Sequence, residues 1–279
     1  MKMNNKLGCH VSMSAPDYLL GSLNEAVSFG ANCFMIYTGS PQSFRKPPID
    51  KLNIASFRTA LKKSGININD VVVHCPYIMN LANNDPTKRS FSMKVLEDEV
   101  SRCMKIGCKY LVLHPGNNIS PETGCKLISF AINQINRKNK NVVICLETMA
   151  GKGVEIGCNF KHLSQIINDV ENKDLIGVCM DTCHLNDSGT NIIDVDRVLN
   201  EFDQKVGLKY LKVLHINDSL NCIGSRKDRH ANIGKGTIGL NVLRKWVNHP
   251  LLKTLPKILE TPYVNGQPIY DKEIKILLE

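Results

Sequence analysis

Histidine and carboxylate residues recur at the ends of apolar runs in this sequence of 279 residues. One apolar run ends in Asp181, and His184 follows three residues later. Five further runs end in a single histidine or glutamate: His74, His114, Glu147, His215 and Glu260. The loop after His215 adds Asp228 and His230. Such runs are typical of buried parallel strands, whose carboxyl ends carry the active sites of barrel enzymes.

These five histidines and four carboxylates are typical metal ligands. Taken singly, a polar residue at a strand end is more often a hydrogen-bonded core residue or an ion-pair partner. A cluster of unneutralised carboxylates is costly to desolvate, however, and bound cations offset that cost. Imidazole and carboxylate without thiolate favour zinc. Three ions with about three protein ligands each would leave positions open for water and substrate, and two ions with bridging ligands are the alternative.

Eight apolar segments alternate with amphipathic segments, and these elements must position the candidate ligands. We expect strands at residues 7–12, 33–38, 71–76, 110–115, 142–148, 176–181, 211–217 and 256–261. Helices are expected at residues 17–29, 50–64, 85–107, from 120 onwards, 160–170, 192–206, 240–247 and 270–278. This alternation predicts an α/β fold: a single (β/α)8 TIM barrel domain over residues 1–279, with the metal cluster at the carboxyl ends of its strands. An open, doubly wound sheet is the alternative.

The composition indicates an intracellular protein. Hydrophobic residues make up 43% of the chain, which suits one large core. The eleven cysteines form no C-x-x-C pair, so we expect reduced thiols in a reducing compartment: the cytoplasm or nucleoid, or a virion if the protein is viral. The amino terminus lacks the apolar core of a signal peptide, and no run approaches the ~20 apolar residues of a membrane span. We therefore expect no membrane association.

The formal net charge is +9, which alone is weak evidence for a polyanionic partner. The placement of the basic residues is more informative, because many lie in or near loops that follow predicted strands: Arg45, Lys46, Lys88, Arg89, Lys152, Arg226, Lys227, Arg229 and Lys235. Cations around a metal cluster are typical of a groove that grips a phosphate backbone. The pattern indicates a phosphodiester substrate, and the alternative is that these loops are simply solvated.

Two glycine-rich segments look like nucleotide-binding motifs. Residues 234–239 match G-x-G-x-x-G, but they follow a polar loop instead of a strand, and residues 151–153 lack the P-loop spacing. Neither predicts a nucleotide cofactor, although both could bring backbone N–H groups near a phosphate. Among the remaining histidines, His10 ends the first strand and is expected to support the ligands, whereas His162 and His249 are expected at the surface.

Several segments closely resemble the endonuclease IV family of apurinic/apyrimidinic endonucleases, and the match covers nearly the whole chain. The most specific are HPG at residues 114–116, LETMAG at 146–151, DTCH at 181–184, HINDS at 215–219, GSRKDRH at 224–230 and GKG at 234–236. The resemblance implies that the nine candidate ligands bind three zinc ions, with manganese as an alternative in one position. One ion would be held by His74, His114 and Glu147. Glu147 would bridge to a second ion held by Asp181, His215 and Glu260, and the third would be held by His184, Asp228 and His230.

The resemblance also implies an activity: zinc-dependent hydrolysis of the phosphodiester 5′ to an abasic site in double-stranded DNA, as in base excision repair. The products would be a 3′-hydroxyl and a 5′-deoxyribose phosphate, and blocked 3′ ends would also be trimmed. Glu147 and Glu260 are the expected catalytic residues, because they would orient the attacking water and the ligands. The expected DNA contacts are Tyr77 at the lesion, Gln42 in the loop after the second strand, and Arg45, Arg226, Arg229 and Lys235. We expect a monomer.

Two other functions compete with this one. A sugar isomerase or epimerase on the same barrel would use two metals and a lysine in the mouth, and the set of Asp228 and His230 would be superfluous. A non-catalytic protein that binds DNA lesions would hold structural zinc, for which cysteine ligands are usual. Metal-dependent nicking of DNA distinguishes both from an endonuclease.

Overall fold

A closed barrel of eight parallel strands forms the centre of the computed structural model, which describes residues 5–279. Around the barrel the strands follow the order β1, β10, β7, β6, β5, β4, β3, β2. Their bounds are β1 Leu7–His10, β2 Phe34–Tyr37, β3 Val71–His74, β4 Tyr110–Leu113, β5 Val143–Glu147, β6 Ile176–Asp181, β7 Leu211–His215 and β10 Lys257–Leu259. The predicted (β/α)8 barrel is confirmed. An open sheet is excluded, because β1 pairs with both β2 and β10.

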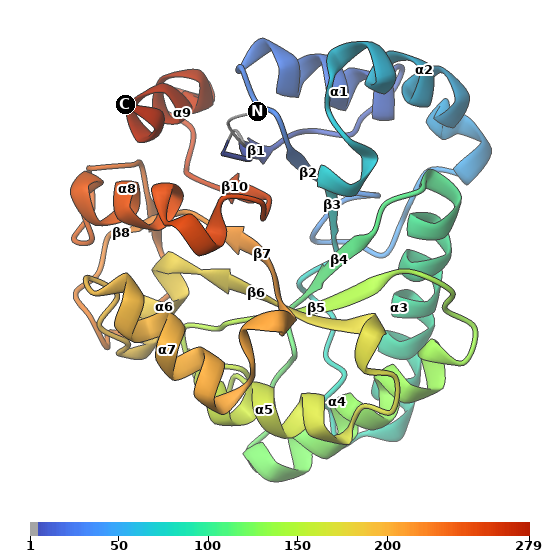
Figure 1. Ribbon diagram of the computed structural model, residues 1–279. Coiled ribbons are helices and arrows are strands. Elements are labelled where there is room, and N and C mark those ends of the chain that lie inside the picture. Colours follow the sequence, from blue (N-terminus) through green and yellow to red (C-terminus); the bar gives the residue numbers. More distant parts are fainter. Residues whose placement is uncertain (1–4) are drawn as a thin grey trace.

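Helices surround the barrel (Figure 1). Their bounds are α1 Leu19–Ser28, α2 Ile54–Ser64, α3 Pro86–Ile106, α4 Pro121–Asn136, α5 Phe160–Asp169, α6 Thr182–Ser188, α7 Val195–Lys205, α8 Leu240–Asn248 and α9 Tyr270–Leu278. α3 and α4 begin at prolines, and Asp85 and Ser120 cap them with side-chain oxygens. None of the helices within residues 5–279 meets the length and hydropathy required of a membrane-spanning segment.

The alternation of side chains along the strands places the candidate ligands. The barrel interior is filled by Cys33, Met35, Val72, Val112, Val143, Cys145, Cys179, Val213 and Ile258. Successive residues of a strand point to opposite faces, so a residue two positions beyond an interior residue also points toward the barrel axis. Glu147 follows Val143 and Cys145 in this way. The same step of two leads from interior residues to His74, His114, Asp181, His215 and Glu260.

The segment after β6 contains a helix that the sequence pattern does not predict. α6 begins directly after the strand, and Asp181 caps it by accepting a hydrogen bond from the His184 backbone N–H at 2.8 Å. The residues from Thr182 to Asp187 are all buried. α6 therefore lacks the polar face that reveals a surface helix in a sequence. Asp181 and His184 therefore lie on a helical turn.

A short antiparallel hairpin lies in the connection after β7, where β8 (Asp218–Ser219) pairs with β9 (His230–Ala231). Other differences from the predicted elements are small. The first helix begins at Leu19, because Tyr18 before it has a left-handed φ of 46°. The segment predicted as one helix at residues 50–64 divides into a 3-10 turn, Ile49–Leu52, and α2.

Candidate metal centre

Glu147 lies at the carboxyl end of β5, where it is buried at the centre of the candidate ligands. Its Oε2 lies 3.0 Å from His74 Nε2 and 3.1 Å from His114 Nε2. The other ring nitrogen of His74, Nδ1, donates to the Cys75 carbonyl at 2.6 Å. That bond fixes the ring and leaves Nε2 available as a metal ligand.

A second group forms around His215, whose Nδ1 faces three carboxylates. It lies 3.1 Å from Glu147 Oε1, 2.9 Å from Glu260 Oε2 and 3.8 Å from Asp181 Oδ2. Asn217, which follows β7, links two of these acids: its Nδ2 donates to Asp181 Oδ2 at 2.7 Å, and its Oδ1 accepts from the Glu260 backbone N–H at 2.8 Å. The sequence pattern offers no reason to single out Asn217, although it lies two residues beyond a predicted ligand.

The third group combines α6 with the connection after β7. His184 donates from Nδ1 to the Thr148 carbonyl at 2.8 Å, so its Nε2 is directed to Asp228 Oδ1 at 3.0 Å. His230 donates from Nδ1 to the Glu260 carbonyl at 3.1 Å, and its Nε2 lies 3.6 Å from Asp228 Oδ1. Asp228 has a left-handed φ of 57°, so the backbone is not extended there, yet its side chain and that of His230 converge.

The structure brings the candidate ligands together in three groups, each with ligand atoms within 4.8 Å of one another. The groups are His74, His114 and Glu147; Glu147, Asp181, His215 and Glu260; and Asp181, His184 and His230. Asp228 lies beside the third group through its contact with His184. The donor set suits metal ions, because His230 Nε2 is buried without a hydrogen-bond partner and faces carboxylates. A cation would satisfy that nitrogen.

The electrostatics of the cluster follow from imidazoles packed against carboxylates. Burial favours the neutral form of Glu147, but His215 and His114 outweigh it and hold the pKa of Glu147 well below its ordinary value. Burial likewise favours neutral His184, but Asp181, Asp228 and Glu147 raise its pKa well above the ordinary value. These opposite shifts favour the charged forms of Glu147 and His184, and bound cations would take the place of the imidazole proton.

Two further side chains border the cluster. The His10 ring lies 5.1 Å from that of Tyr37, and the Tyr37 ring lies 5.0 Å from that of His74. Tyr37 was not among the predicted residues, although it continues the interior series of Cys33 and Met35 by the same step of two. Burial raises the pKa of Tyr37 well above its ordinary value, so its hydroxyl stays protonated at neutral pH.

The histidines expected at the surface are instead partly buried. Nδ1 of His162 accepts from the Gly157 N–H at 3.3 Å, and Nε2 of His249 lies 3.1 Å from Asp196 at the start of α7. Both rings therefore have structural contacts away from the three groups.

Carboxylates of the chain itself occupy both glycine-rich segments. The N–H groups of Gly234, Gly236 and Ile238 donate to the buried Asp218 carboxylate at 3.0 to 3.1 Å. Those of Gly151 and Lys152 donate to Glu155 at 3.0 and 2.8 Å. These N–H groups are therefore already bound to carboxylates of the chain, and none of them is free to bind a phosphate. A side chain at position 236 would collide with Asp218, which explains the glycine there.

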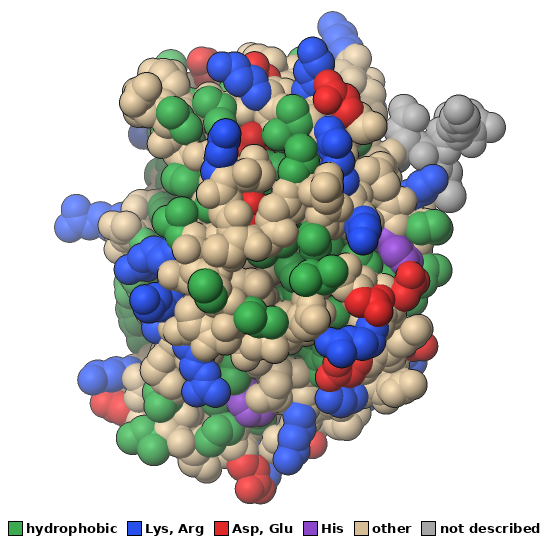
Figure 2. Space-filling view, turned by 90° about the vertical axis from the view of Figure 1, so that its left-hand side faces the viewer, with side chains coloured by type: hydrophobic (Ala, Val, Ile, Leu, Met, Phe, Trp, Pro, Cys, Tyr) green, Lys and Arg blue, Asp and Glu red, His purple; other side chains and the backbone are tan. Residues whose placement is uncertain are grey.

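The basic residues predicted at the rim divide into two kinds. Lys46 is buried in ion pairs with Asp98 and Glu99 at 2.8 and 2.7 Å, and Arg89 donates to backbone carbonyls. These two brace loops instead of facing solvent. The exposed ones are Arg45, Lys88, Lys152, Arg226, Lys227, Arg229 and Lys235. Figure 2 shows one side of the molecule, where Lys and Arg side chains project along the left-hand edge with few acidic side chains beside them.

Gln42 and Tyr77 are also exposed. The Tyr77 ring stacks on that of His114, with 6.5 Å between centroids and 28° between planes. Tyr77 therefore borders the candidate metal centre.

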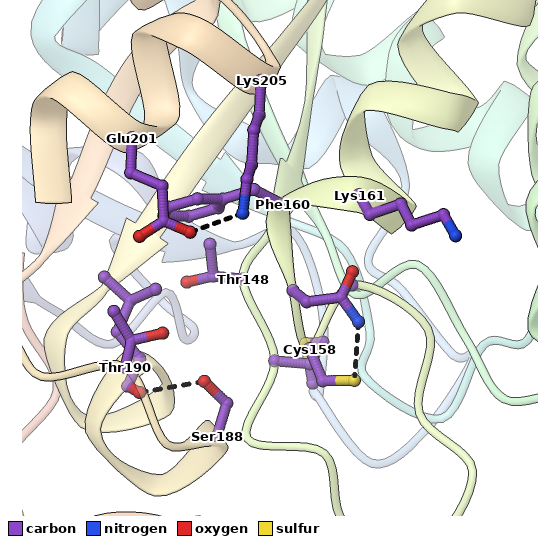
Figure 3. Close-up of a pocket in the computed structure, with 12 residues that line it drawn as sticks. Thr148, Cys158, Phe160, Lys161, Ser188, Thr190, Glu201 and Lys205 are labelled. Atoms are coloured by element: carbon purple, nitrogen blue, oxygen red, sulfur yellow. Dashed lines mark hydrogen bonds and ion pairs between the residues drawn. The ribbon is translucent and has the colours of Figure 1, made fainter.

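A cavity of about 250 Å³ lies behind the third group, between the end of β5 and helices α5, α6 and α7 (Figure 3). Glu201 and Lys205 of α7 pair across its upper side at 2.6 Å, and Asn159 donates to the Cys158 thiol. Thr148 lines the cavity and also receives the His184 hydrogen bond, so this wall supports the cluster.

The fold and these side chains define a TIM barrel with a candidate metal centre at the carboxyl end of its strands. Residues 23–279 match the model of the Xylose isomerase-like TIM barrel family. Proteins described as probable endonuclease 4 from Acholeplasma laidlawii and Bacillus subtilis are 47% and 48% identical to the chain. The matches cover 97% and 98% of this chain and 94% and 95% of the relatives. The chain belongs to the endonuclease IV family.

Solved structures agree with this assignment. Endonuclease IV from Thermus thermophilus has a TM-score of 0.85 at 29% identity, over 98% of this chain and 97% of its own. A D-tagatose 3-epimerase-like protein has a TM-score of 0.71 at 18% identity, over 98% of this chain and 95% of its own. At that identity the second likeness shows the fold alone. The predicted resemblance to endonuclease IV is confirmed.

Proposed function

We propose that the protein is a metal-dependent DNA repair endonuclease that hydrolyses the phosphodiester 5′ to an abasic site in double-stranded DNA. One observation carries the proposal: four imidazoles, from His74, His114, His184 and His215, lie within 3.3 Å of the Glu147 carboxylate. A stability role does not require this crowding, whereas a multinuclear metal centre does. Membership of the endonuclease IV family supports the same reaction.

We further propose three zinc ions as the cofactors. The first two groups of side chains correspond to the expected ligand sets that share Glu147, and the third set would be His184, Asp228 and His230. When bound, the ions polarise water and offset the charge that builds up on the phosphate. Glu147 and Glu260 are the proposed catalytic residues, because their carboxylates reach into the space between the imidazoles.

The mouth of the barrel suits a nucleic-acid substrate. Tyr77 presents an exposed ring beside His114, where it can pack against an extruded sugar that has lost its base. Gln42, Arg45, Arg226, Arg229 and Lys235 are exposed and are proposed to contact the DNA. All eleven cysteines are free, which supports a reducing compartment. We also propose that the protein acts as a single-domain monomer without a nucleotide cofactor and trims blocked 3′ ends.

The test uses a duplex with one tetrahydrofuran abasic analogue and protein purified without chelator. Cleavage is mapped on both strands, with an intact duplex and a Glu260→Gln variant as controls. Nicking 5′ to the analogue, lost after chelation and in the variant, is the expected result. Binding without nicking would instead identify a lesion-binding protein. Isomerisation or epimerisation of a ketose by the fully metallated enzyme, without nicking, would identify a sugar enzyme.

A further inference from the structure

Asp187 lies near the end of α6, outside the nine candidate ligands, and is fully buried. Its Oδ1 accepts from Ser219 Oγ at 2.6 Å and from Asn186 Nδ2 at 3.1 Å. Its Oδ2 accepts from Asn221 Nδ2 at 3.1 Å and from the backbone N–H of Asp228 at 2.9 Å. A buried carboxylate is costly unless it is hydrogen-bonded, and these four donors compensate it.

Two of the residues that Asp187 holds have unusual backbones. Its carbonyl accepts from the N–H of Arg226 at 2.9 Å, while its side chain holds the N–H of Asp228. Arg226 and Asp228 have left-handed φ angles of 56° and 57°. Residues with a Cβ rarely adopt this conformation and keep it only when their surroundings impose it. One residue thus holds both non-glycine residues with left-handed backbones in the connection between β8 and β9.

The same helix also positions a candidate ligand directly. His184 precedes Asp187 by three residues, so the two side chains lie on one face of α6. His184 Nε2 faces Asp228 Oδ1 at 3.0 Å. α6 therefore sets the position of His184 through its own backbone and that of Asp228 through Asp187.

We propose that Asp187 is a positioning residue, which holds the connection between β8 and β9 so that Asp228 completes a metal site with His184 and His230. The inference rests on the proposed metal centre. Asparagine at position 187 would keep the size of the side chain but place an N–H₂ group against one pair of donors. The site would then hold its ion less tightly, while the first two groups of ligands stay intact.

The experiment compares the wild type with Asp187→Asn and with Asp70→Asn. Asp70 is also buried, but it lies before β3 at the other end of the barrel, where it accepts from Lys6 Nζ at 2.6 Å. Each protein is purified without chelator, challenged with EDTA, and analysed for metal. Hydrogen exchange of the amides of residues 226 and 228 is measured on the fully chelated proteins.

We expect Asp187→Asn to lose about one metal equivalent in the challenge, with about 10- to 100-fold weaker binding at that site. The amide of Asp228 should exchange faster in this variant, and Asp70→Asn should match the wild type in both measurements. Ser219→Ala, which removes one of the four donors and spares the Asp228 contact, should give an intermediate metal loss. It replaces Asp187→Asn in the comparison if that variant does not fold.

Equal metal retention in Asp187→Asn and the wild type would overturn the inference, even if exchange were faster, because loop order would then not control the ion. A wild type that binds metal but does not nick DNA would defeat the proposed endonuclease and leave the role of Asp187 standing. A wild type that takes up no metal would overturn both.

Discussion

Buried charges are compensated in different ways at the two ends of the barrel. At the amino end, Lys257 of β10 is fully buried, and its Nζ donates to the carbonyls of Leu252 and Leu255 at 2.6 and 3.2 Å. Lys6, which precedes β1, pairs with Asp70, which precedes β3, at 2.6 Å. At the carboxyl end, carboxylates and imidazoles crowd around Glu147, and His230 Nε2 has no partner among the described residues. The chain satisfies the buried charges at the amino end with its own groups, whereas the carboxyl end offers a donor set that suits added cations.

Removal of the metals should have the largest effect on stability. It would affect the carboxyl end of the barrel and leave the amino end unchanged. At metal concentrations 1,000-fold above Kd, each occupied site stabilises the fold by about 4 kcal/mol. Chelation at pH 8 should therefore lower the melting temperature strongly, and calorimetry checks this. An unchanged melting temperature would show that the stability of the fold depends on bound metal at neither end of the barrel.

The stability of the chelated protein should depend on pH with a definite sign. The pKa of His184 is raised, so its contribution is fully present below the unfolded value of about 6.5 and is lost as pH rises through the folded pKa. The pKa of Glu147 is lowered, so its contribution is present above about 4.3 and is lost as pH falls. The chelated protein should be most stable between these values, whereas the metallated protein gains stability above pH 6.5. The free energy of unfolding, measured with denaturant at several pH values for the chelated and the metallated protein, checks these opposite trends above pH 6.5.

Glu147→Gln should have the largest effect of the single substitutions on activity. It removes the charge shared by two groups of ligands and should lower kcat/KM about 1,000-fold or more, the equivalent of about 4 kcal/mol. Asp70→Asn is the matched control, because it removes a buried charge at the amino end. Its kcat/KM should stay near that of the wild type, and equal losses in the two variants would remove the contrast between the ends.

The Lys257→Met substitution tests the effect of the buried charge at the amino end of the barrel. Burial lowers the pKa of Lys257 from 10.5 to about 8. The unfolded chain therefore binds a proton that the folded protein does not bind between these values, and wild-type stability falls by about 3 kcal/mol as pH falls through this window. The variant lacks this loss, so its stability relative to the wild type should increase from pH 10.5 down to pH 8. Paired denaturant unfolding curves measure the difference, and a constant difference would contradict the shift.

Arg226→Ala should have the smallest effect, because an exposed cation at the mouth contributes mainly a phosphate contact. The logarithmic salt dependence of DNA binding should weaken by about one unit, with little change in kcat. Lys62→Ala, on the exposed face of α2, serves as the control and should leave the salt dependence unchanged. Titration of a labelled duplex at several salt concentrations gives both slopes.

The positions of the candidate ligands were predictable, because side chains alternate between the two faces of a strand. A buried strand that ends in His, Asp or Glu presents that residue at the mouth, as Glu147 and His215 show. The barrel itself followed from eight alternations of apolar and amphipathic segments. These predictions depend on local pattern, which the sequence contains in full.

The supporting residues depend on contacts between distant segments, and no local pattern reports them. Asp187 meets Asp228 across 41 positions of the chain, and Asp218 meets Gly236 across 18. Lys46 looked like a rim cation because its partner Glu99 lies on another element. α6 was missed because burial on all sides removes the helical polarity pattern. The residues that hold the ligands in place therefore became visible only in three dimensions.

Diffraction at the zinc absorption edge, from crystals of protein purified without chelator, tests the central claim most directly. We predict three anomalous peaks: one between His74, His114 and Glu147, a second beside His215 and Glu260, and a third between His184, Asp228 and His230. The absence of peaks among these residues in protein that nicks abasic DNA would contradict the metal centre at the carboxyl end of the barrel.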